Sequence, residues 1–150
     1  MLKMLIQDKF DNSTAFSSSV QILIENCRSK FKENIGIESV KTLELESDSG
    51  LQVIGEFIHQ KHSPMTGKIG SLVKLKSSSS LIDREALSVL GTKIAKQVVA
   101  LSDRNIDRDK LLKSEYMFSD IGTVKNFIAF HEEALKTDIT LDGIEFAKIK

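Results

Sequence analysis

Two strand-like segments joined by a short loop constrain the fold of this chain more than any other feature. Residues 53–59 and 68–76 are rich in branched and aromatic side chains, and apolar residues of the second segment share one face. The loop between them, residues 60–67, contains the only proline, Pro64. This pattern predicts an antiparallel hairpin.

A third strand-like segment precedes the hairpin. Alternating apolar residues begin at Ile35, and the alternation slips by one position further along. A bulge near Ser39 or a bend near Thr42 would reconcile the two halves. Because residues 47–50 have the composition of a turn, we expect three consecutive strands with short links, which is an antiparallel meander.

Three further segments have the spacing of amphipathic helices. Apolar residues recur every three or four positions in residues 16–31 and again from about 83 to 102. A third helix follows Thr123, which is a suitable N-terminal cap. The first apolar stripe consists of Phe16, Val20, Leu23, Cys27 and Phe31. Cys27 lies on this stripe, so we expect it to be buried rather than reactive.

The remaining segments complete the order of elements. Residues 103–113 are charged and lack periodicity, so we expect a connection there. A final strand spans about 139–149, and its apolar alternation breaks across Asp142 and Gly143.

Two of these segments look alike. Residues 34–40 and 138–144 each follow a helix and each contain a slip in alternation, which hints at a weak internal repeat. We therefore predict an α+β fold with a mostly antiparallel sheet, helices packed on one face, and two related subdomains.

The composition limits the classes of partner. The chain has 150 residues, of which 41% are hydrophobic, so it can bury a core as one domain or two small subdomains. Its 21 basic and 21 acidic side chains leave no net charge, which argues against direct nucleic-acid binding. Cys27 is the single cysteine, so neither an internal disulfide nor a zinc site built on several cysteines is expected. No apolar run approaches the roughly 18 residues that a membrane span needs.

No catalytic arrangement stands out. The histidines His59 and His62 lie at a strand end and in a loop without a carboxylate pair at ligand spacing, so we expect no metal site. His131 lies on the inner stripe of a helix and is most simply half-buried. Residues 66–71 superficially resemble a phosphate loop, but the lysine is followed by isoleucine and opens a strand. We therefore expect no enzymatic activity and no cofactor.

Several motifs in order resemble one protein family, elongation factor Ts. They cover about residues 31–150 with suitable helices between them. The motifs are KENIGIESV at 32–40, FIH at 57–59, GKIGSLV at 67–73, LLKSEYMF at 111–118, TV at 123–124 and IEF at 144–146.

The resemblance implies a guanine-nucleotide exchange factor without catalytic residues of its own. Its partner would be elongation factor Tu, whose magnesium and phosphate sites the factor disturbs so that GDP leaves. The family core has two related subdomains. On this reading residues 1–33 are the remnant of the first, and residues 34–150 form the second.

The resemblance also implies four partner-binding residues. His59 matches a histidine that contacts the partner near its nucleotide, although a polar strand end is the plainer interpretation. Phe31 matches an apolar contact, with core packing as its alternative, and the next residue, Lys32, stands where the family has glycine. Asp8 and Phe10 resemble a worn form of an aspartate–phenylalanine motif, one residue short and not adjacent; the alternative is an unrelated loop.

The family's amino-terminal helical domain and its long coiled-coil hairpin have no counterpart in this sequence. The absence of the hairpin favours the mitochondrial branch, hence the mitochondrial matrix, with the bacterial cytoplasm as the alternative. The alternative function is a degenerate homologue that acts as a protein-interaction module, by homo-association or with another protein, without exchange. A small unrecognised hydrolase is a third reading, disfavoured because no nucleophile and base can be named.

Overall fold

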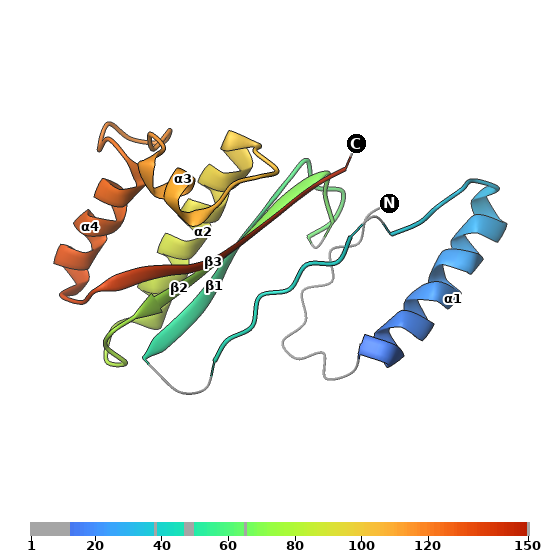
Figure 1. Ribbon diagram of the computed structural model, residues 1–150, viewed down its shortest axis with the longest axis horizontal. Coiled ribbons are helices and arrows are strands. Elements are labelled where there is room, and N and C mark those ends of the chain that lie inside the picture. The colour runs from blue at the N-terminus through green and yellow to red at the C-terminus, as the bar shows by residue number, and fades with distance from the viewer. Residues whose placement is uncertain (1–12, 38, 47–49, 65, 150) are drawn as a thin grey trace.

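A computed structural model describes residues 13–37, 39–46, 50–64 and 66–149 of the chain. Its centre is a three-stranded antiparallel sheet in the order β1-β2-β3 (Figure 1). The strands are β1 (Leu51–His59), β2 (Ile69–Ser77) and β3 (Ile139–Lys148). The expected hairpin is therefore confirmed, and the final strand of the chain pairs with β2 rather than extending a meander.

The longest helix of the core, α2 (Arg84–Leu101), packs against β1 and β2. Asp83 caps its start by accepting a hydrogen bond from the Glu85 amide, and Ser102 ends it in the left-handed conformation. The predicted stripe is fully buried over four positions and forms the centre of the core with side chains of the strands. These four residues are Leu87, Leu90, Ile94 and Val98.

Two shorter helices complete the layer on this side of the sheet (Figure 1). Helix α4 (Val124–Leu135) begins after Thr123, whose hydroxyl accepts from the Asn126 amide, which confirms the predicted cap. The connection expected at residues 103–113 is wrong in its second half, because α3 (Arg108–Lys113) is a short helix. An aspartate caps α3 and one buried leucine anchors it, so the helix is too short to give a periodic signal.

Residues 39–46, which we call the strap, do not form the predicted strand. The strap runs along the face of the sheet opposite α2, where Leu43 packs on Gly143 of β3 (Figure 1). Because the strap lies on a face and not beside an edge strand, its backbone has no ladder to join. Leu43 is half-buried against the sheet, whereas Val40 and Leu45, the other two apolar residues of the strap, are exposed.

The break in alternation predicted in β3 is confirmed as a β-bulge. Lys74 pairs with Gly143 and Leu75 with Leu141, so Asp142 is the extra residue of the bulged strand. The bulge brings the Asp142 carboxylate to 2.8 Å from the Lys74 ammonium group. This hydrogen bond raises the pKa of Lys74 and lowers the pKa of Asp142.

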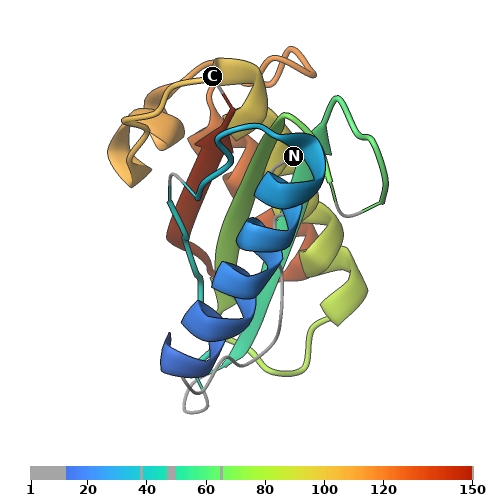
Figure 2. The ribbon, with the colours of Figure 1, turned by 90° about the vertical axis from the view of Figure 1, so that its right-hand side faces the viewer.

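The first helix, α1 (Ser13–Phe31), exists as predicted but does not bury the expected stripe. Leu23 is 60% exposed and Phe31 57%, while Val20 and Cys27 are half-buried. Figures 1 and 2 show why: α1 lies beyond the strap, away from the sheet and its helices. Amphipathic spacing indicated a helix here without indicating what would cover it.

Two related subdomains are not seen in the part of the chain that the structure describes. One sheet is present there, built from residues 51–148. Residues 34–37 and 39–40, which the repeat matched to the start of β3, form no strand. The proposed boundary between residues 1–33 and 34–150 stays a prediction.

Candidate partner-binding surface

His59 is the last residue of β1 and is exposed at the tip of the β1–β2 hairpin. Its carbonyl oxygen accepts a hydrogen bond from the Lys68 amide at 3.2 Å, which closes the strand pair behind it. Gln60 then turns the chain with a φ of 53°. The end of a regular strand therefore fixes the backbone of His59, while its side chain faces solvent.

The loop after His59 is held by its own hydrogen bonds. The Ser63 and Thr66 hydroxyl groups lie 2.7 Å apart, and the His62 amide donates to the Thr66 carbonyl at 2.9 Å. Thr66 is buried, so it ties the loop to the strands beneath. The hairpin tip is therefore a defined structure that can present side chains to a partner.

Gly67 explains why the motif that follows the loop begins with glycine. A Cβ atom at this position would lie 2.7 Å from the His59 carbonyl oxygen and would overlap the Ile58 side chain. No other residue type fits without moving the strand end that carries His59. Gly67 therefore allows the loop to pack closely against the strand end that carries His59. This packing accounts for the glycine without a phosphate-binding loop.

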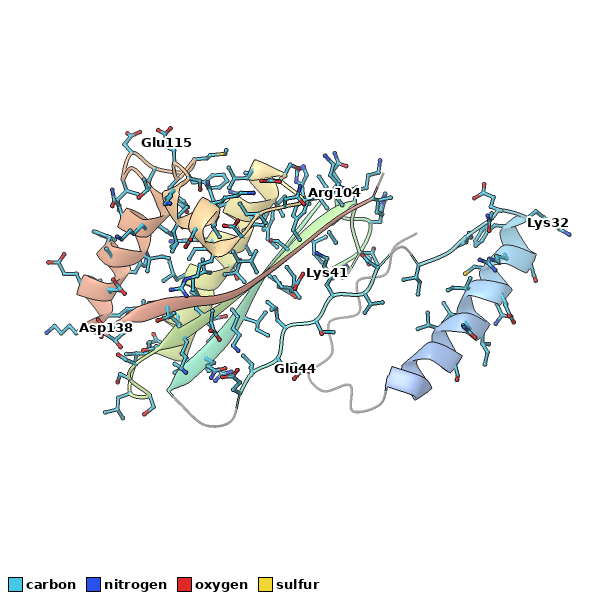
Figure 3. The ribbon with its side chains drawn as sticks, in the orientation of Figure 1. Lys32, Lys41, Glu44, Arg104, Glu115 and Asp138 are labelled. Carbon is cyan, nitrogen blue, oxygen red and sulfur yellow. The ribbon has the colours of Figure 1, made fainter. Side chains whose placement is uncertain are left out.

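Phe31 is the last residue of α1, and its ring is exposed with the Lys30 ammonium group 5.5 Å from its centroid. The alternative of core packing is wrong for Phe31 in the described structure. Lys32, at the end of α1 in Figure 3, has a φ of 56°, and its amide donates to the Arg28 carbonyl at 2.9 Å. A left-handed residue after a helix is usually glycine, which gives a conformational reason for the family's glycine at this position.

The hairpin tip and the C-terminal end of α1 both lie in the upper part of the molecule in Figures 1 and 2. His59 and Phe31, which belong to these two elements, are both accessible to a partner. Asp8 and Phe10 lie outside the described residues, so their place on this surface stays a prediction.

Among the described residues, no three histidine, cysteine, aspartate or glutamate side chains gather where they could hold a metal ion. His131 is half-buried as predicted: its Nδ1 lies 2.9 Å from the Phe127 carbonyl, and its ring meets the edge of Phe127. No described helix combines the length and apolar character needed to cross a bilayer.

The sequence reasoning missed Gln97, a fully buried polar residue of α2. Its amide donates to the Glu115 carbonyl at 2.8 Å, and its Oε1 accepts from the Met117 amide at 3.0 Å. Between these two residues Tyr116 stacks on Phe127, with ring centroids 3.9 Å apart. The motif at 111–118 is therefore anchored to the core. The sequence feature that could have indicated this contact is the position of Gln97, three residues after the buried Ile94 on the inner face of α2.

Comparison with known proteins supports the family suggested by the motifs. No protein-family model matches the chain. Elongation factor Ts of Methylorubrum populi is 35% identical to the chain over 91 residues, which are 61% of this chain and 28% of that protein. The match thus spans little more than a quarter of the relative, and the relative is bacterial, so nothing found supports the mitochondrial branch. Over this matched part, the chain is similar to elongation factor Ts.

Proposed function

We propose that this chain is a guanine-nucleotide exchange module that binds elongation factor Tu and promotes release of GDP. The observation that carries the proposal is the similarity to elongation factor Ts. It is supported by the accessibility of His59 on a hydrogen-bonded hairpin tip. The chemistry required is binding alone, because GDP leaves without any bond being made or broken.

The proposed mechanism is thermodynamic coupling between two binding events. A module that binds nucleotide-free elongation factor Tu more tightly than the GDP complex must weaken GDP binding by the same ratio. A coupling free energy of about 3 kcal/mol corresponds to about 150-fold weaker binding of GDP. The hydrogen bonds within the loop after His59 favour such coupling, because less conformational freedom is lost when the tip contacts the partner.

Within this proposal, each predicted residue has a role. The His59 side chain contacts the partner near its nucleotide, and Phe31 adds an apolar contact from the end of α1. Asp8 and Phe10 supply the altered aspartate–phenylalanine motif, with Phe10 entering an apolar pocket of the partner. The accessibility of His59 and Phe31 is consistent with these roles.

The test is release of fluorescent GDP from elongation factor Tu in the presence of excess unlabelled GDP. We expect the chain at micromolar concentration to accelerate release, and we expect His59→Ala to slow it. His62→Ala is the matched control, because this exposed histidine lies in the loop that directly follows His59 but carries no predicted role. Absence of acceleration, together with absence of a complex on a sizing column, would reject the proposal.

A second candidate function is an interaction module that binds without exchange. The altered aspartate–phenylalanine motif at Asp8 and Phe10 favours it, because the two residues are not adjacent as the motif requires. So do the exposed apolar side chains of α1, which homo-association or another protein could cover. A complex with elongation factor Tu that leaves the rate of GDP release unchanged would select this function, as would a stable homodimer that binds no elongation factor Tu.

A further inference from the structure

The strap crosses the outer face of the sheet and is fixed there by a small number of side-chain contacts. Lys41 Nζ lies 3.2 Å from Glu145 Oε2, and Figure 3 shows Lys41 on the side of the strap that faces the strands. Two residues on, Leu43 rests on Gly143. At its end, the Glu46 amide donates to Gln52 Oε1 at 2.9 Å, and the Glu46 carboxylate lies 3.8 Å from Lys74 Nζ.

These contacts differ in kind from those that hold the strands. Within the described ranges, residues 39–46 make no backbone-to-backbone hydrogen bond with β1, β2 or β3. Two of the four anchors are ion pairs in which the strap side chain is well exposed, 42% for Lys41 and 66% for Glu46. Salt screens such pairs, whereas it leaves a backbone ladder intact.

The closed position of the strap also leaves one polar group unsatisfied. Gln52 is buried on the outer face, and its Nε2 has no hydrogen-bond partner among the residues that the structure describes. A buried amide without a partner opposes the state that buries it, and water could satisfy it once the strap is lifted. The Oε1 atom of the same side chain accepts the hydrogen bond from the Glu46 amide. Gln52 therefore lies at the contact that breaks when the strap leaves the sheet.

The buried lysine of the sheet, Lys74, does not depend on the strap for its closest ion pair. Lys74, the most buried cation of the outer face, keeps its 2.8 Å contact with Asp142, which belongs to β3. Removal of the strap therefore leaves no buried charge unpaired. The strap can leave without breaking the strand pairs or the core on the other face.

From these observations we propose that the strap is a displaceable cover: it switches between a closed position on the outer sheet face and an open position that exposes Gln52 and Lys74. The closed position is held by apolar contact with Gly143 and by two screened ion pairs, and the open position is favoured by hydration of Gln52. Ionic strength shifts the balance, because it weakens the ion pairs and not the apolar contact.

The distance between the strap and β3 tests this directly. Spin labels are placed on the full chain at Glu44→Cys and Thr140→Cys, both exposed positions, in a Cys27→Ser background. Pulsed electron–electron double resonance is measured at about 0.05 M and about 1 M NaCl, between which the Debye length falls several-fold. At low salt we expect a narrow peak at short distance. At high salt we expect the broad population at longer distance to be at least about twice as large as it is at low salt.

Variants separate strap release from unfolding. Lys41→Gln with Leu43→Ala removes two anchors from the strap alone, and we expect the long-distance population to dominate even at low salt. Leu45→Ala is the matched control, because Leu45 lies in the same strap and is exposed. Thermal unfolding followed by circular dichroism checks that the body stays folded in both. A single narrow distance that neither salt nor the anchor variant alters would overturn the proposal.

Discussion

Gly55 of β1 and Gly91 of α2 meet backbone to backbone. A Cβ atom added to Gly91 would lie 3.1 Å from the Gly55 nitrogen and 3.2 Å from its Cα, and one added to Gly55 would overlap the main chain of Gly91. The long helix therefore lies directly on the strand that carries His59 at its end.

Gly55→Ala should destabilise the protein by about 2 kcal/mol or more, because the added methyl group meets backbone that cannot rotate away. Gly91→Ala is the matched comparison, since its contacts are looser and alanine favours a helix over glycine by about 1 kcal/mol. The free energy of unfolding in urea measures both. Equal stability of the two variants would contradict the packing described.

Gln97→Met should cost about 2 kcal/mol, because two part-buried hydrogen bonds, to the Glu115 carbonyl and from the Met117 amide, are lost together. Lys93→Met, an exposed change on the same helix, should leave stability within about 0.5 kcal/mol. Chemical denaturation of both variants gives the comparison. A loss for Gln97→Met no greater than for the control would show that the turn at 115–117 is held by other contacts.

The Lys74–Asp142 pair should make stability depend on pH at both extremes. The hydrogen bond from Lys74 lowers the pKa of Asp142 below its ordinary 3.8, so its contribution is complete above that value and is lost as the pH falls through the lowered value. The same bond raises the pKa of Lys74 above its ordinary 10.5, so this contribution is complete below 10.5 and is lost as the pH climbs through the raised value.

We therefore expect the difference in unfolding free energy between the wild type and Lys74→Met to be largest near neutral pH and to shrink toward both extremes. Denaturant titrations at a series of pH values measure it. Lys76→Met, two residues along the same face, should show a smaller change with pH. A difference that stays constant from neutral pH into strong acid would mean that the pair adds nothing to stability.

Local patterns in the sequence predicted most of the secondary structure. Three features were predicted correctly: the apolar stripe of α2, the cap at Thr123 and the break in alternation at Asp142. Each depends on contacts within a few residues or with a single neighbouring layer. The strap was mistaken for a strand because of the spacing of Val40, Leu43 and Leu45, although Val40 and Leu45 are exposed and Leu43 packs on Gly143. Whether such a segment joins a sheet edge or crosses a sheet face depends on where it lies relative to the rest of the chain.

The candidate site was less accessible to such reasoning. The hairpin tip could be located from the strand pattern, but the exposure of Phe31 could not, because the amphipathic spacing of α1 indicated burial. Gln97 was overlooked since a polar residue on an apolar stripe has a clear meaning only when its partners are known. Those partners are backbone groups about 20 residues away, which no periodicity reports.

Phe31→Ala should weaken binding to elongation factor Tu by about 2 kcal/mol, close to 30-fold, without lowering the melting temperature by more than a few degrees. Leu23→Ala is the matched control, since it is equally exposed on α1 and has no predicted role. We expect Phe10→Ala to behave as Phe31→Ala does. Titration calorimetry and thermal melts check these variants, and unfolding of either would place that residue in the core.

The proposed exchange function requires that the chain bind elongation factor Tu more tightly without nucleotide than with GDP. Its dissociation constant should be measured by calorimetry against nucleotide-free elongation factor Tu and against the GDP complex under one set of conditions. We predict tighter binding to the nucleotide-free form by about 150-fold, as a coupling free energy near 3 kcal/mol requires. Equal affinity for the two forms would contradict the account, because a ligand without preference cannot shift the equilibrium.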